Sequence, residues 1–218
     1  MKSKIIVFIS LSTIFLTFTS NATDKTTQQA KRFNAETDLL LAQFDCKTDV
    51  DDLHSVAAFA TLLSGTEFSK IRYHAVAGTY GIQQGLYVPP NDLFQLAFGS
   101  NWTDADENLK GAVEQVKAIV KSTLVNEGHI WIAEAGQSDF TAELIKAIQA
   151  ELHDINTSQR IHVVQHSDWN EECTSPSSLD FVKKNADYQK IPDGNSIGNG
   201  TPGFRSPEYT QWKNKIAN

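Results

Sequence analysis

Short apolar runs alternate with amphipathic stretches along most of the chain. The short runs predict buried strands at residues 38–44, 71–76, 129–135, 161–166 and 188–191. Between them, apolar residues recur at the three- and four-residue spacing of one helix face, at residues 53–63, 104–125, 140–148 and 176–185. Strands that alternate with helices indicate an α/β fold, in which an open, mostly parallel sheet carries helices on both faces.

The remaining segments are rich in glycine, proline and polar residues. Residues 78–102 contain Gly81, Gly85, Pro89 and Pro90 and are expected to form one long irregular loop, which in a compact domain is usually functional. Residues 167–175 are expected to be a polar turn and residues 193–207 a loop. Residues 208–218 are expected to form a short helix.

A rule for parallel sheets directs attention to four of these segments. Ligands bind outside the carboxyl ends of the strands, so the functional residues are expected directly after strands. Those segments are residues 45–52, 78–90, 136–139 and 167–172, and each is polar or glycine-rich.

The amino terminus has the layout of a secretory signal peptide over residues 1–22. Lys2 and Lys4 precede an apolar stretch at residues 5–18, and small residues surround Ala22. This stretch is short for a membrane span of roughly 20 residues, so we expect an exported protein, periplasmic or secreted, without a stable membrane anchor. A polar lead-in at residues 23–37 and a single domain at residues 38–218 follow.

The net charge of the chain disfavours one class of partner, and its cysteines allow two arrangements. The 218-residue chain has a net charge of −7 and no clustered basic residues, which disfavours nucleic acid as a partner. Cys46 and Cys173 are its two cysteines. In an exported protein they form either one disulfide or two separate thiols, and the sequence favours neither.

Acidic side chains are most concentrated in the acidic turn, residues 45–52, after the first strand. Asp45, Asp49, Asp51 and Asp52 lie within it, and carboxylates this close repel one another unless something offsets their charge. A hard cation such as Ca²⁺ or a bound polyol would do so. Alternatively, one aspartate caps the following helix and the others are solvated.

The acidic turn resembles the signature of the nucleoside hydrolase family, Asp-x-Asp-Pro-Gly-x-Asp-Asp after the first strand. Asp45, Asp51 and Asp52 match its first and its two last acidic positions. Residues 130–144 are similar to the family's strand that ends in a Gly-Pro-Leu-Thr-Asn turn, and residues 168–170 are similar to its Glu-Phe-Asn triplet. The likeness extends over roughly residues 38–195 and implies a shortened nucleoside-hydrolase-like domain.

The resemblance implies calcium-assisted hydrolysis of the N-glycosidic bond of a nucleoside or related sugar compound. It assigns calcium to Asp45, Asp52 and the main-chain carbonyl of Asp139, and the sugar to Asp51, Asp168 and Asn170. The family's general base is its second aspartate, which this chain lacks, so Asp45 or Asp49 would have to take over that role. Trp169 lies in a loop after a strand and is expected to contact the ligand.

Lys47 departs from this pattern, because it stands where the family has its second aspartate. An ammonium group cannot bind calcium, and it could replace the cation. The sequence therefore supports two hypotheses: a calcium-assisted hydrolase, or a non-catalytic exported domain that binds a sugar or nucleoside with Lys47 in place of the metal.

Overall fold

The computed structural model describes residues 32–47 and 50–192. The chain divides into a unit at Met1–Arg32 and a unit at Phe33–Asn218, and the description below concerns the second. The expected signal peptide, most of the polar lead-in, Asp49, the loop at residues 193–207 and the helix at residues 208–218 lie outside the described residues.

Six parallel strands form one sheet in the order β3-β2-β1-β4-β5-β6. The chain proceeds from β1 outward to β3 and then returns to place β4 on the other side of β1. The carboxyl ends of β1 and β4 therefore form the point where the strand order reverses, which is where ligands bind in such sheets. The strands are β1 (Leu39–Phe44), β2 (Tyr73–Ala77), β3 (Trp102–Asp104), β4 (Ile130–Glu134), β5 (Ile161–His166) and β6 (Asp187–Ile191).

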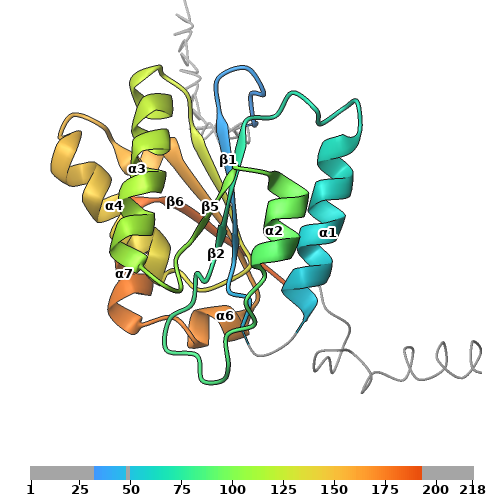
Figure 1. Ribbon diagram of the computed structural model, residues 1–218. Helices are drawn as coiled ribbons and strands as arrows, with labels where there is room; N and C mark the ends of the chain where they lie inside the picture. The colour runs from blue at the N-terminus through green and yellow to red at the C-terminus, as the bar shows by residue number, and fades with distance from the viewer. Residues whose placement is uncertain (1–31, 48–49, 193–218) are drawn as a thin grey trace, which may run out of the picture. The chain divides into compact units, whose positions relative to one another are not determined.

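Helices lie on both faces of the sheet, which confirms the expected open α/β fold (Figure 1). On one face, α1 and α2 pack on β1 and β2 through Val56, Phe94 and Phe98. On the other face, α3, α4 and α7 cover a larger core that contains Leu41, Ile132 and Val163. The helices are α1 (Asp51–Ser64), α2 (Asn91–Phe98), α3 (Leu109–Val125), α4 (Asp139–Glu151), α5 (Thr157–Arg160), α6 (Asp168–Glu172) and α7 (Pro176–Asn185).

The prediction of an irregular loop at residues 78–102 is wrong for the second half of that range. That half contains α2 and the start of β3. Phe94 is fully buried there and packs edge-on against Phe44, with ring centroids 5.7 Å apart. Only this tertiary contact reveals the helix, because its eight residues are too few to show a clear periodicity.

The start of the long helix and the expected turn at residues 167–175 also differ from the structure. The long helix begins at Leu109 rather than at Asp104, because Asp104 belongs to β3 and the Asn108 side chain caps the helix by accepting from the N–H of Gly111. The polar turn at residues 167–175 contains α6. None of the described helices has the length and apolar composition needed to cross a bilayer.

Candidate functional site

The acidic turn connects β1 to α1 at the carboxyl end of the sheet. Asp45 and Asp52 are 6% and 5% exposed, whereas Asp51 is half-buried at the start of α1. Oδ2 of Asp52 accepts a hydrogen bond from the N–H of Cys46 at 2.7 Å, and Oδ1 of Asp51 accepts one from the N–H of Asp52 at 2.8 Å. These backbone N–H groups therefore offset part of the repulsion between the neighbouring carboxyl groups.

Asp45 is held by donors from two segments. Its Oδ1 accepts the N–H of Lys47 at 2.9 Å, and its Oδ2 accepts Nε2 of Gln137 at 2.9 Å. The same Nε2 donates to Oδ1 of Asn170 at 3.0 Å, and Nδ2 of Asn170 donates to the carbonyl of Ala135 at 2.8 Å. Three post-strand segments thus meet in one buried chain of hydrogen bonds.

Gln137 is the central residue of this chain, and sequence reasoning missed it. An amide carries two donors and an acceptor, so it can join a carboxylate to another amide. Oε1 of Gln137 also accepts the N–H of Gly81 at 3.0 Å, which ties in the loop after β2. Its position directly after a strand was a usable signal, but a single glutamine has no motif of its own.

Electrostatics distinguish the two buried aspartates. Burial raises the pKa of Asp52 well above its ordinary value, and the neighbouring charge of Asp45 together with a hydrogen bond between the two carboxyl groups raises it further. Asp45 instead accepts one hydrogen bond from an amide and one from a backbone N–H. Asp52 is therefore suited to hold a proton at a pH where an exposed aspartate has lost it.

Lys47 is directed toward the loop after β2. Its Nζ donates to the carbonyl of Gln83 at 3.0 Å and lies 3.8 Å from the centre of the Tyr80 ring. Nε2 of Gln83 in turn donates to the carbonyl of Lys47 at 3.1 Å. The ammonium group is therefore anchored by a carbonyl and an aromatic face.

The expected ligand residues after β4 and β5 have different surroundings. Oδ2 of Asp139 accepts the N–H of Ser175 at 3.1 Å, so this side chain joins the start of α4 to the segment before α7. Asp168 is 81% exposed and forms an ion pair with Lys190, and Trp169 is 50% exposed. Of residues 168–170, only Asn170 is buried in the hydrogen-bonded chain.

The calcium site expected at Asp45, Asp52 and the main-chain carbonyl of Asp139 stays a prediction. Asp45, Asp52 and Asp139 already accept hydrogen bonds from protein N–H groups, including the Gln137 amide. No group of three or more histidine, cysteine, aspartate or glutamate side chains suitable for a metal ion occurs in residues 32–47 and 50–192. Asp49 lies outside these ranges.

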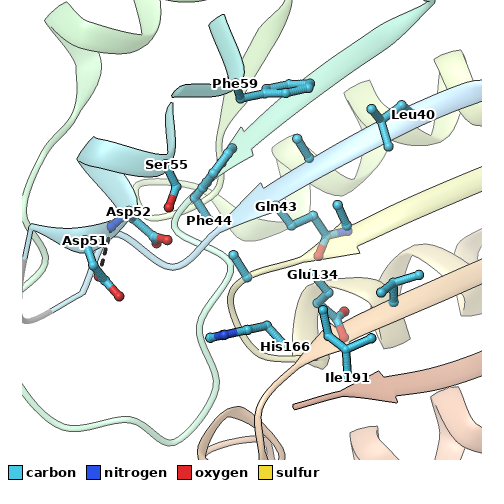
Figure 2. Close-up of a pocket in the computed structure, with 14 residues that line it drawn as sticks. Leu40, Gln43, Phe44, Asp51, Asp52, Ser55, Phe59, Glu134, His166 and Ile191 are labelled. Atoms are coloured by element: carbon cyan, nitrogen blue, oxygen red, sulfur yellow. Dashed lines mark hydrogen bonds between the residues drawn. The ribbon is translucent and has the colours of Figure 1, made fainter. Parts of the chain in front are cut away.

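A cavity of about 460 Å³ opens beside the acidic turn, on the α1 side of the sheet. Asp51, Asp52 and Ser55 of α1 form its polar rim, and Figure 2 shows the ring of His166 extending toward the same region. The rest of the wall is mainly apolar and comes from four strands and α1. These residues include Leu40, Ala42, Phe44, Phe59, Ala133, Ala135, Val164 and Ile191.

A buried polar cluster lies between the sheet and α4. Glu134 accepts hydrogen bonds from the hydroxyl groups of Ser138 at 2.7 Å and Thr141 at 2.5 Å, and Ser138 also contacts Oε1 of Gln165 at 3.0 Å. Burial raises the pKa of Glu134 to about 7, although both hydroxyl groups favour its charged form. Nε2 of Gln43, in the same cluster, is buried without a hydrogen-bond partner among the described residues.

Both cysteines are free thiols, Cys46 buried and Cys173 partly exposed. Of the two alternatives that the sequence left open, the structure therefore shows separate thiols. Burial and the nearby charges of Asp52 and Asp45 raise the pKa of Cys46, which leaves it a poor nucleophile.

Comparison with known proteins gave no match: no family model, no curated protein and no solved structure is significantly similar to this chain.

Proposed function

We propose that the chain is an exported binding domain for a small hydroxyl-rich compound of the nucleoside or sugar class. One observation carries the proposal: the cavity at the point of strand-order reversal places two acids and a serine beside a mainly apolar wall. Carboxylates accept hydrogen bonds from sugar hydroxyl groups, and apolar side chains pack against a sugar ring or a base.

The buried chain of Asp45, Gln137 and Asn170 supports this proposal in a second way. Through side-chain hydrogen bonds it fixes the backbone at the ends of β1 and β4, next to Phe44 and Ala135 of the cavity wall, before any ligand binds. A pre-formed site loses less entropy when a ligand binds. In this proposal binding depends on no metal ion.

Calorimetric titration of the full mature chain with a panel of nucleosides and free sugars tests the proposal. We expect at least one compound to bind, and Asp51→Asn to weaken its affinity about tenfold, because a charged acceptor is exchanged for a neutral amide. Asp92→Asn, in the exposed first turn of α2, is the matched control and should bind as the parent does. If no nucleoside or sugar binds at millimolar concentration, the proposal is wrong.

A second candidate function, N-glycoside hydrolysis in the same cavity, is favoured by the Asp45–Asp52 pair. Asp52 lines the cavity, and its raised pKa suits a group that protonates a departing base nitrogen while water adds to the anomeric carbon. Reducing sugar released from nucleosides would be measured with the parent and with Asp52→Asn. Release that persists unchanged in Asp52→Asn would exclude this role for Asp52.

A further inference from the structure

A buried acid lies beside the turn that carries Gln137. Glu134, the last residue of β4, is 1% exposed, and Ser138 stands four residues later, directly before α4. Gln165 of β5 contacts both sides of this turn: its Nε2 donates to the carbonyl of Gly136 at 2.9 Å, and its Oε1 lies 3.0 Å from the hydroxyl of Ser138. These side chains therefore hold the residues on either side of Gln137.

The hydroxyl group of Ser138 has more acceptors than hydrogens. It lies 2.7 Å from Oε2 of Glu134 and 3.0 Å from Oε1 of Gln165, and its one hydrogen cannot serve both oxygens. The Gln165 amide cannot turn to supply a donor, because its Nε2 is held by the carbonyls of Glu134 and Gly136. An ionised Glu134 would take the hydrogen and leave the buried Oε1 of Gln165 without a donor, since the described residues offer it no other.

A proton on Glu134 removes this shortage. Oε2 then donates to Ser138, and Ser138 donates to Gln165. The hydroxyl of Thr141 donates to Oε1 of the same acid and also has Oε1 of Gln43 at 3.1 Å. A half-turn of the Gln43 amide directs its Nε2, which has no partner among the described residues, to that hydroxyl. Each of these contacts then contains one hydrogen.

We infer that Glu134 is a positioning residue of the candidate site, which fixes Gln137 while it is a neutral acid and loosens it on ionisation. For ligand binding the inference rests on the proposed function, because Gln137 is the centre of the hydrogen-bonded chain next to the cavity wall. When the proton leaves to water, the hydroxyl of Ser138 turns from Gln165 to Glu134. The turn then loses a hydrogen bond beside Gln137.

Glu134 is the titrating member of this cluster. The amides of Gln43 from β1 and Gln165 from β5 do not ionise. Burial raises the pKa of Glu134 to about 7, and the charge of Asp139 at the start of α4 adds to the rise, whereas the hydroxyl groups oppose it only while they donate to the acid. From β6, Tyr188 stays neutral, because burial and nearby acids raise its pKa.

NMR titration of the full mature chain from about pH 4 to about pH 9 tests the inference. The side-chain carboxyl carbon of Glu134, the side-chain amide of Gln137 and the backbone amide of Ser138 should move with one midpoint at about pH 7. Glu134→Gln should remove this midpoint from the Gln137 signal, because the new amide donates to Ser138 and accepts from Thr141 as the neutral acid does. Glu143→Gln, at an exposed position of α4, is the matched control and should titrate as the parent does.

Two results of the titration would overturn the inference. One is a Glu134 midpoint near its ordinary value of 4.5, and the other is a Gln137 signal that titrates equally in the parent and in Glu134→Gln.

Calorimetry with adenosine, uridine and ribose measures the effect on the site. Between about pH 6 and about pH 8.5, the parent should lose about fivefold more affinity than Glu134→Gln does. Equal losses in the two proteins would exclude the positioning role. Absence of binding by all three compounds would refute the proposed function alone, because the NMR midpoints require no ligand and decide the role of Glu134 by themselves.

Discussion

Gln137 donates one amide group to both Asp45 and Asn170, at 2.9 Å and 3.0 Å, and so joins the segments that follow β1, β4 and β5. All three side chains are buried. The acidic turn thus satisfies part of its charge internally, through the amide nitrogen of Gln137.

Removing this amide should be costly. Gln137→Ala leaves Oδ2 of Asp45 and Oδ1 of Asn170 buried without this donor, and we expect the free energy of unfolding to fall by about 2–4 kcal/mol. Urea denaturation measures the change. Gln95→Ala, at an exposed position of α2, is the control and should alter it by less than about 0.5 kcal/mol. If Gln137→Ala lowers the free energy of unfolding as little as Gln95→Ala does, the structural role of Gln137 is refuted.

Glu134 should make stability depend on pH. Its pKa is about 7 in the folded chain and 4.5 ordinarily, so the folded state holds the proton more tightly than the unfolded state. The stabilisation is complete below pH 4.5, declines as the pH rises toward 7, and is absent above it. Because Gln cannot ionise, Glu134→Gln should be roughly 3 kcal/mol more stable relative to the parent at pH 8 than at pH 4.

Urea denaturation of the parent and of Glu134→Gln at both pH values provides this comparison. For each protein, the change in the free energy of unfolding between pH 4 and pH 8 is determined, and the two changes are compared. Titrations elsewhere in the chain contribute equally to both changes and therefore cancel. A difference that is the same at pH 4 and pH 8 would mean that Glu134 does not titrate abnormally.

Gly81 should tolerate no side chain. A Cβ at this position would overlap with Oδ2 of Asp139 and would lie 2.7 Å from the carbonyl oxygen of Cys173. We expect Gly81→Ala to lower the free energy of unfolding by about 1–3 kcal/mol, because two backbone segments must move apart. Gly65→Ala is the matched control, since its nearest atom would be the Leu62 carbonyl at 3.2 Å. Equal thermal unfolding of the two variants would contradict the close packing.

Calcium should have little effect on stability. The carboxyl groups of Asp45 and Asp52, which were expected to bind it, accept hydrogen bonds from protein donors. We therefore expect millimolar calcium or EDTA to shift Tm by less than about 1 °C, since a ligand that does not bind the folded state cannot stabilise it. A rise of several degrees with calcium would revive the metal-assisted hypothesis, with Asp49 as a further ligand.

Hydrophobic periodicity was sufficient to predict five of the six described strands, all but β3, and the longer helices. The short apolar runs that became β1, β4 and β5 end in polar residues, and buried parallel strands require that pattern. The same reasoning selected residues that the structure brings together, because Asp45 directly follows β1 and Asn170 lies in the segment after β5. It failed for α2, whose eight residues owe their burial to contacts with Phe44 and Trp102.

The sequence by itself determined the α/β class and the segments that meet at the carboxyl ends of the strands, because both depend on local periodicity and on the position of polar residues after strands. Only the tertiary structure decided which side chains pair there. The roles of Gln137 and Lys47 depend on hydrogen bonds between residues far apart in the chain, such as Gln137 to Asp45 and Lys47 to Gln83. No local pattern encodes such a pairing, since the folded backbone alone sets the distance between the partners.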